Sequence, residues 1–133
     1  MFKNKIALIG GGNIGGMLAV LSAQREVGDI AIVDVFEGVA SGKALDIMHA
    51  NAADGLKTKL SGTTDYSNIK DADVVIVTAG FPRKEGMSRD DLLQKNAEVI
   101  RIVGKNIKEK APSAFVIVIT NPLDIMVGIM QDA

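Results

Sequence analysis

The stretch Lys5-Ile6-Ala7-Leu8-Ile9-Gly10-Gly11-Gly12-Asn13-Ile14-Gly15-Gly16 decides the fold that we expect for this chain. It begins with an apolar run short enough for a buried strand, and then breaks into glycines with the spacing G-x-G-x-x-G at Gly10, Gly12 and Gly15. A helical pattern follows, in which apolar residues recur at three- and four-residue steps: Ile14, Met17, Leu18 and Leu21. A strand, a tight turn and a helix start in this order are typical of a site that binds a dinucleotide pyrophosphate.

Each glycine of this motif has its own physical role. Gly10 allows the chain to turn sharply, and Gly12, which has no Cβ, lets the backbone approach a phosphate. Gly15 lets the helix pack close to the strand. The free N–H groups at the start of the helix then face the negative charge of the phosphate. The motif therefore predicts a nucleotide site, provided that the rest of the chain supplies its other parts.

An acidic residue follows the second apolar run. Residues 30–33 are apolar and mostly β-branched, which predicts a strand buried on both faces, and the run ends at Asp34. Asp34 lies close to the spacing of about 20 residues at which a carboxylate binds the hydroxyls of the adenosine ribose. A 2′-phosphate would be repelled by this carboxylate, and no arginine follows it directly. We therefore predict NAD, rather than NADP, as the cofactor.

The composition bounds the class of protein. A chain of 133 residues, 47% of them hydrophobic, has room for one domain with a real core. Its net charge of −1 gives no electrostatic reason to expect nucleic acid or an anionic membrane as a partner. Cysteine is absent, which excludes disulfides, thiolate metal sites and a cysteine nucleophile, and we predict no metal site. The apolar run before Gly10 is too short for a signal peptide or a membrane span, so we expect a cytoplasmic protein.

Apolar strands alternate with helical patterns along the chain. We predict strands at residues 3–9, 30–33, 57–63, 73–78 and 114–119. We predict helices at residues 13–27, 38–53, 88–110 and 123–130, and one helical turn within residues 65–71. The alternation predicts an α/β fold, a doubly wound parallel sheet of the Rossmann type with strand order 3-2-1-4-5. The ligand is then expected beyond the C-terminal ends of strands 1 and 4, where the order reverses.

The helices carry few side chains with chemistry of their own. In the second helix the packing positions are expected to be Val39, Leu45, Ile47 and Met48. Ser88 and Asp91 form an approximate capping box at the start of the long helix. The only histidine, His49, has no partner that would support proton transfer, which favours a structural or interface role.

Several segments together resemble NAD-dependent malate dehydrogenase of the lactate dehydrogenase-like group. They are Gly10-Gly11-Gly12-Asn13-Ile14-Gly15, Asp34, the loop Thr78-Ala79-Gly80-Phe81-Pro82-Arg83-Lys84-Glu85-Gly86-Met87-Ser88-Arg89 and the turn Thr120-Asn121-Pro122-Leu123-Asp124. The match runs in register from residue 3 to residue 124. The loop and the Thr-Asn-Pro turn are more specific signals than the glycine motif.

The resemblance implies roles for the residues at matching positions. Cofactor would be bound by Gly10, Gly11, Gly12, Asn13, Ile14, Gly15, Asp34, Asn96, Ile119, Thr120 and Asn121. Substrate would be bound by Arg83, Arg89 and Asn121, with the loop of residues 81–88 closing over it.

Arg83 occupies the position at which malate enzymes of this group carry arginine and lactate enzymes usually carry glutamine. The chemistry agrees, because a guanidinium can pair bidentately with the second carboxylate of oxaloacetate, which pyruvate lacks. Arg89 would polarise the reacting carbonyl and stabilise the negative charge that develops on its oxygen.

The resemblance also implies that part of the family's machinery lies outside this sequence. Chains of the family are much longer, and their later part carries the His–Asp proton-transfer pair and the arginine that binds the first carboxylate of the substrate. We therefore assign no catalytic residue in this chain. Residues 1–133 are expected to form the NAD-binding domain without the C-terminal catalytic domain and without the sixth strand, which leaves strand 5 as an open edge.

Three functions follow as alternatives. The first is the cofactor-binding half of malate dehydrogenase, an oligomeric oxidoreductase of the tricarboxylic acid cycle, which binds NAD(H) in this form with little or no turnover. The second is a nucleotide-binding module that self-associates through its open edge. The third is a lactate-type 2-hydroxy acid dehydrogenase, against which Arg83 argues.

Overall fold

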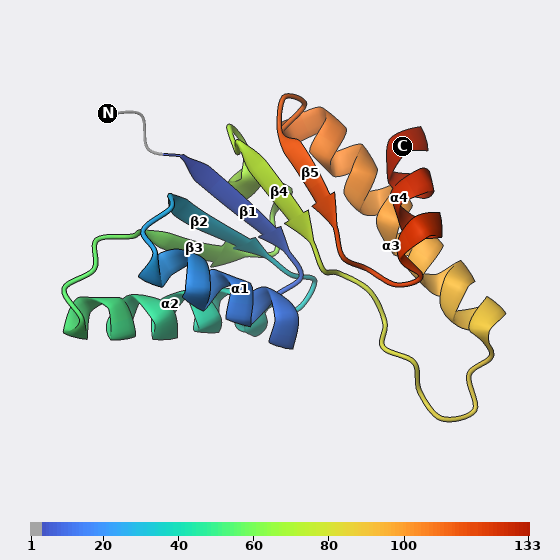
Figure 1. The fold of residues 1–133 in the computed structure, drawn as a ribbon, viewed down its shortest axis with the longest axis horizontal. Helices are drawn as coiled ribbons and strands as arrows, with labels where there is room; N and C mark the ends of the chain where they lie inside the picture. Colours follow the sequence, from blue (N-terminus) through green and yellow to red (C-terminus); the bar gives the residue numbers. More distant parts are fainter. Residues whose placement is uncertain (1–3) are drawn as a thin grey trace.

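A computed structural model describes residues 4–133 as a five-stranded sheet with helices on both faces (Figure 1). The strands are β1 (Lys5–Ile9), β2 (Asp29–Val33), β3 (Leu60–Thr63), β4 (Val74–Val77) and β5 (Phe115–Val118). Neighbouring strands pair in parallel, in the order β3-β2-β1-β4-β5. This topology confirms the predicted fold class and strand order.

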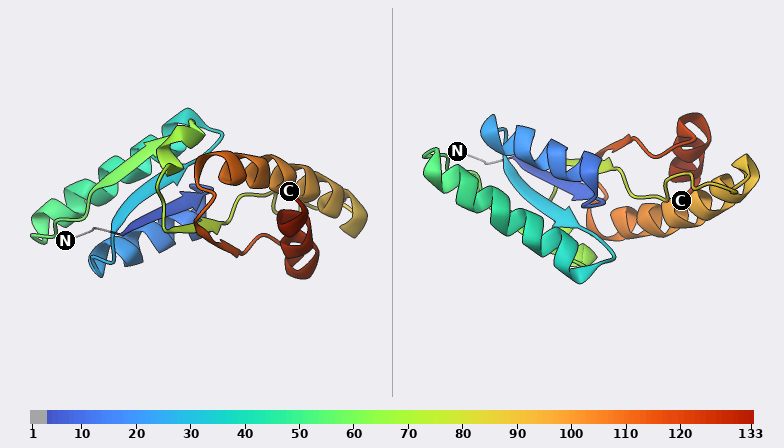
Figure 2. Two further views of the ribbon diagram at one scale, coloured as in Figure 1. Left: turned by 90° about the horizontal axis from the view of Figure 1, so that it is seen from above. Right: turned by 90° about the horizontal axis from the view of Figure 1, so that it is seen from below.

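The helices form two groups around the sheet. They are α1 (Asn13–Gln24), α2 (Glu37–Ala53), the 3₁₀ helix η1 (Tyr66–Ile69), α3 (Arg89–Lys110) and α4 (Leu123–Asp132). In both views of Figure 2, α1 and α2 lie towards one end of the molecule, and α3 and α4 towards the other. The chain runs outward from β1 through β2 to β3 and then returns to β4 and β5 on the other side of β1, which produces this arrangement.

The core consists of two apolar clusters, one on each face of the sheet, because successive side chains of a strand point to opposite faces. On one face the strands contribute Leu8, Ile30, Ile32 and Leu60, which pack against alanines of α1 and α2. On the other face they contribute Ala7, Ile9, Ala31, Val33, Val75 and Val77, which pack against α3, η1 and Met126 of α4. The central strands are therefore covered on both faces, as their near-continuous apolar runs predict.

The start of β1 and the end of α1 differ from the predicted bounds. β1 begins at Lys5 because its partner β2 begins at Asp29, while Lys3 lies outside the described residues. α1 ends at Gln24 rather than at residue 27, since Glu26 adopts a left-handed conformation with φ 47°. The N–H groups of residues 26 and 27 donate to the carbonyls of residues 23 and 22, at 3.0 and 3.4 Å. These two bonds form a Schellman motif, which the sequence did not signal because glycine usually occupies the left-handed position.

The buried faces of α1 and α2 consist of small residues. In α1 the buried residues are Gly15, Gly16, Ala19 and Ala23, whereas Ile14 and Met17 are each 58% exposed. In α2 the predicted packing residue Leu45 is 50% exposed, so that prediction is wrong, and Ala40 and Ala44 are buried instead. A Cβ at Gly62 in β3 would overlap the carbonyl oxygen of Ala40. The helices therefore approach the sheet through small residues, while Ile47 of α2, predicted to pack, is buried as expected.

The other differences concern the ends of elements. β3 begins at Leu60 rather than at residue 57, because the N–H groups of Lys57 and Lys59 donate to side chains, Glu26 Oε1 at 2.9 Å and Asp29 Oδ1 at 3.1 Å. β4 and β5 are one residue shorter at each end than predicted, β2 and α2 begin one residue earlier, and α4 continues to residue 132. Within residues 4–133, no helix combines the length and apolar character needed to cross a membrane.

Candidate nucleotide and substrate site

The glycine turn between β1 and α1 leaves no room for side chains at two positions. Gly10 has a φ of 106°, a conformation that side-chain-bearing residues rarely adopt. A Cβ at Gly15 would overlap the carbonyl oxygen of Gly10, so the first turn of α1 packs directly on the end of β1. Gly12 caps the helix, and Gly12, Asn13 and Ile14 are exposed. The start of the helix thus faces solvent, where its free N–H groups can meet an anion.

Asp34 lies directly beside this turn, at the C-terminal end of β2. Its Oδ2 atom accepts a hydrogen bond from the Gly11 N–H at 2.6 Å, and its Oδ1 atom accepts one from the Phe36 N–H at 3.0 Å. The two bonds fix the orientation of a half-buried carboxylate. The structure therefore brings together Asp34 and the glycine turn, which are far apart in the sequence.

Two residues without a predicted binding role adjoin this pair, of which Thr78 was expected at the site crevice and Tyr66 was not. Thr78, at the end of β4, donates through Oγ1 towards the carbonyls of Ile9 at 3.3 Å and Gly10 at 3.2 Å. Burial of Tyr66 in η1 raises the pKa of its hydroxyl above the usual 10.0, and the negative charge of Asp34 raises it further. Strand order predicts that Thr78 lies at the site, because β4 neighbours β1, and its bonds to β1 and the glycine turn confirm this position. No sequence signal places Tyr66 near Asp34, since η1 reaches β2 only through tertiary packing.

A second group of polar residues lies where the chain leaves β4 and β5. Thr120 is buried, and its Oγ1 atom donates to the Ala79 carbonyl at 2.7 Å. Asn96 of α3 is also buried and bonds to the backbone of both Phe81 and Asn121. Asn121 itself is exposed and precedes a cis peptide bond to Pro122, while Ile119 is half-buried. The structure thus groups Asn96, Thr120 and Asn121 as one cluster.

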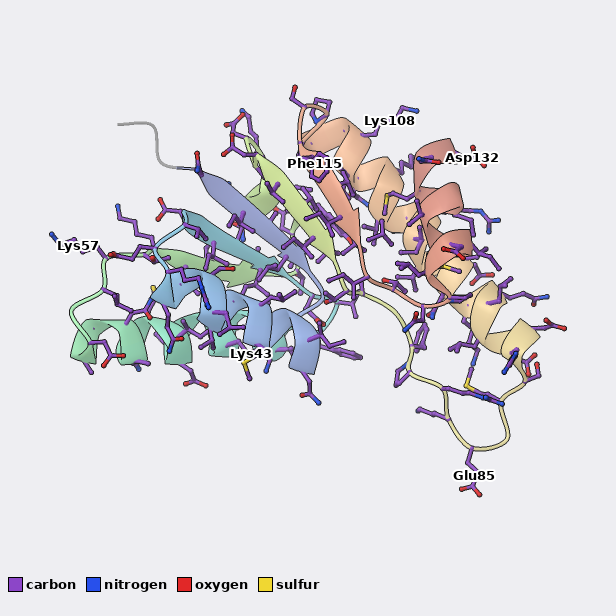
Figure 3. All side chains as sticks on the ribbon, viewed as in Figure 1. Lys43, Lys57, Glu85, Lys108, Phe115 and Asp132 are labelled. Atoms are coloured by element: carbon purple, nitrogen blue, oxygen red, sulfur yellow. The ribbon has the colours of Figure 1, made fainter. Side chains whose placement is uncertain are left out.

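The loop between β4 and α3 projects from the sheet, with Glu85 at its tip (Figure 3). Arg83 lies in this loop and Arg89 is the first residue of α3; both are exposed. Within the described part of the chain, neither guanidinium makes a hydrogen bond or an ion pair. The predicted substrate arginines therefore follow β4 in the sequence, and within residues 4–133 no hydrogen bond or ion pair joins them to Asn96, Thr120 or Asn121.

The loop ends in the predicted capping box. The Asp91 N–H donates to Ser88 Oγ at 3.0 Å, and the Ser88 N–H donates to Asp91 Oδ2 at 3.1 Å. These hydrogen bonds with Ser88 lower the pKa of the Asp91 carboxyl below its usual 3.8. Both bonds fix where α3 begins, and hence where Arg89 lies.

Other parts of the surface do not contribute to the site. His49 is exposed on α2. Two hollows, of about 240 and 540 Å³, lie at the C-terminal half of α3 beside α4, and no predicted site residue lines either of them. Among residues 4–133, no group of three or more acidic, histidine or cysteine side chains is arranged to hold a metal ion.

Comparison with known proteins gives a consistent match. Residues 4–133 match the family model of the lactate/malate dehydrogenase NAD binding domain. Malate dehydrogenase from Geotalea uraniireducens is 56% identical over 131 residues, which cover 98% of this chain and 41% of that protein. The chain therefore spans about two fifths of the length of this relative.

Solved structures show the same similarity. The crystal structure of Cryptosporidium parvum malate dehydrogenase superposes with a TM-score of 0.93 at 45% identity, over 98% of this chain and 42% of that one. A lactate dehydrogenase from the same organism, complexed with lactic acid and nicotinamide adenine dinucleotide, also superposes with a TM-score of 0.93. Its sequence is 42% identical, over 99% of this chain and 42% of that one.

The Asp34→Asn variant is expected to lower the pKa of Tyr66 towards 10.0, since it removes the nearby negative charge. The pKa should stay above 10.0, because burial is the larger cause of the shift. The chain has one tyrosine and no tryptophan, so the ultraviolet absorbance of tyrosinate reports on Tyr66 alone. Asp46→Asn, on the exposed surface of α2, is the control, and an equal pKa in both variants would contradict the placement of Asp34.

Proposed function

The chain belongs to the lactate/malate dehydrogenase family, whose NAD-binding domain it matches, and we propose that it binds NAD(H) as the cofactor-binding part of a malate dehydrogenase. The reaction that we propose for the whole enzyme moves a hydride between C4 of the nicotinamide and C2 of malate or oxaloacetate. The positions of the glycine turn and Asp34 support the cofactor half of this proposal. The loop arginines support the substrate half.

The observation that carries the proposal is the pairing of Asp34 with Gly11. The bond between them holds a carboxylate beside the exposed helix start of α1. A dinucleotide whose pyrophosphate meets that helix start would place its adenosine ribose next to Asp34. The carboxylate oxygens can accept hydrogen bonds from the 2′- and 3′-hydroxyls, whereas they would repel a 2′-phosphate.

The substrate proposal rests on charge and position. Arg83 would pair with the second carboxylate of a dicarboxylic acid, and Arg89 would stabilise negative charge on the reacting carbonyl oxygen. Arg83 lies in the loop and can approach the Asn121 side of the site if the loop folds over it, whereas the capping box holds Arg89 at the start of α3. Reduction of oxaloacetate also consumes a proton, and we assign no proton donor among residues 4–133. We therefore expect little or no turnover from this chain by itself.

The proposal also covers where the protein acts in the cell and in which metabolic pathway. We propose a cytoplasmic location, which the lack of cysteine suits, and a place in the tricarboxylic acid cycle, which the proposed substrate pair suits. Cell fractionation with an antibody to the chain would test the location.

Self-association through β5 is the second candidate function. β5 pairs with β4 and, within residues 4–133, with no other strand. Its Phe115 and Ile117 side chains are 69% and 40% exposed. An apolar edge strand of this kind tends to pair with another chain through its free backbone groups, and a homo-oligomer could form in this way.

The Asp34→Ala variant is expected to weaken NADH binding by about 10- to 100-fold, the loss typical of hydrogen bonds to a charged group. NADH fluorescence titration measures the affinity, and Asp46→Ala on α2 is the matched control. Because Asp34 also supports the glycine turn, circular dichroism should accompany each titration to show that the variant is folded. Equal NADH affinity in both variants would remove Asp34 from the cofactor site.

The purified chain is expected to bind NADH without oxidising it when oxaloacetate is added. Absorbance of NADH measures the rate, with a full-length malate dehydrogenase as the positive control. Rapid oxaloacetate-dependent oxidation by residues 1–133 would show that a proton donor has been overlooked. Oxidation with pyruvate but not with oxaloacetate would instead favour the lactate-type alternative and argue against the role of Arg83.

The Ile117→Lys variant is expected to shift any dimer towards monomer, because a lysine on an edge strand opposes pairing between chains. Sedimentation velocity over a range of concentrations measures this shift. Ile102→Lys is the control, since Ile102 is 61% exposed on α3, away from β5. A wild-type chain that stays monomeric at all concentrations would argue against self-association.

A further inference from the structure

The amide side chain of Asn96 joins two segments that leave neighbouring strands. Its Oδ1 atom accepts a hydrogen bond from the Phe81 N–H at 2.7 Å, and its Nδ2 atom donates to the Asn121 carbonyl at 2.8 Å. A longer bond of 3.4 Å runs from Nδ2 to the Phe81 carbonyl. Phe81 lies near the start of the loop of residues 78–88 after β4, and Asn121 lies in the turn after β5. One side chain of α3 therefore holds both.

Burial limits what else Asn96 can do. The residue is 2% exposed, and its acceptor and both hydrogens are directed at backbone groups. An amide in this state has little capacity left for a ligand, because each of its polar atoms already has a partner. Its predicted contact with cofactor stays a prediction, and the geometry suggests an indirect role instead.

Two further contacts support the junction that Asn96 forms between the loop after β4 and the turn after β5. The Lys95 ammonium lies over the Phe81 ring, 6.0 Å from its centroid, within reach of a cation–π attraction. A Cβ at Gly80 would lie 2.7 Å from Thr120 Cγ2 and 3.1 Å from Asn96 Oδ1, so the two segments pack without space between them. The loop is thus held at its start by residues 95 and 96 and at its end by the capping box at residues 88–91, all on α3.

We propose that Asn96 is a positioning residue that keeps the start of the loop and the Asn121 turn in a fixed relation to each other. Residues 82–87 then connect two fixed ends, while Asn121 keeps its place at the site. A ligand that contacts Asn121 would then lie at a fixed distance from Phe81, at the start of the loop. The identity of that ligand rests on the proposed function, but the junction itself does not.

Hydrogen exchange of the ligand-free chain, followed by NMR at single amides, tests the junction directly. In Asn96→Leu the Phe81 amide loses its acceptor, and its exchange should become about tenfold faster, the effect of one hydrogen bond. Exchange at the core amides of Leu8 and Val75 should not change. The control is Asn106→Leu, because the Asn106 amide bonds only within α3, to the Ile102 carbonyl at 2.8 Å.

Two results would overturn the proposal. One is an unchanged Phe81 exchange rate in Asn96→Leu, and the other is an equal acceleration at Phe81 and the core amides, which would indicate general destabilisation. If Asn96→Leu does not fold, Asn96→Ala removes the same hydrogen bonds with a smaller side chain and takes its place.

A titration with NADH separates this proposal from the proposed function. We expect NADH to change the Phe81 exchange rate in the wild-type chain but not in Asn96→Leu, because the link from the Asn121 turn is cut. Weaker NADH binding in Asn96→Leu with an unchanged ligand-free Phe81 rate would indicate a direct cofactor contact and overturn the positioning role. A wild-type chain that binds no NADH would refute the proposed function, and the ligand-free exchange would still decide the role of Asn96.

Discussion

The close packing of α1 on the end of β1 is the constraint on which the rest of the site depends. No side chain fits between Gly15 and the Gly10 carbonyl, so the helix starts where the strand ends. This position directs the free N–H groups of the helix towards the C-terminal edge of the sheet. Asp34 bonds to Gly11 at the same edge, and Thr78 reaches Gly10 from the neighbouring strand. The turn therefore aligns the ends of β1, β2 and β4.

The N-terminal half of α3 organises the other side of the site in a different way. There the close fit comes from polar side chains that bond to backbone, with Ser88 at the helix cap and Asn96 in the interior. Buried amides that are fully bonded fix one geometry, because an unpaired alternative would be costly. The geometry around the glycine turn thus depends on the absence of side chains. The geometry around the start of α3 depends on the hydrogen bonds of polar side chains. Both give rigid surroundings to exposed groups such as Asn121 and Arg89.

The pattern of apolar residues predicted element types well and element contacts less well. Strand order, the capping box at Ser88 and the position of Asp34 followed from local signals of known spacing. The buried face of α2 followed only in part: Ile47 is buried as predicted, but Leu45 is exposed and Ala40 and Ala44 are buried, because small residues allow the closer approach to the sheet. The end of α1 at Glu26 also escaped prediction, since a non-glycine residue there carries no signal in the sequence. Hydrophobicity indicates which residues can be buried, but the distance between layers decides which ones are.

By itself the sequence determined the α/β class, the strand order, the glycine turn with its acid and the family resemblance, because each depends on residue type at a fixed spacing. Tertiary structure alone decided that Tyr66 lies near Asp34 and that Asn96 bonds to both Phe81 and Asn121. These interactions join residues that are far apart in the sequence. Their geometry depends on how whole helices pack, and no local pattern of residues encodes that packing.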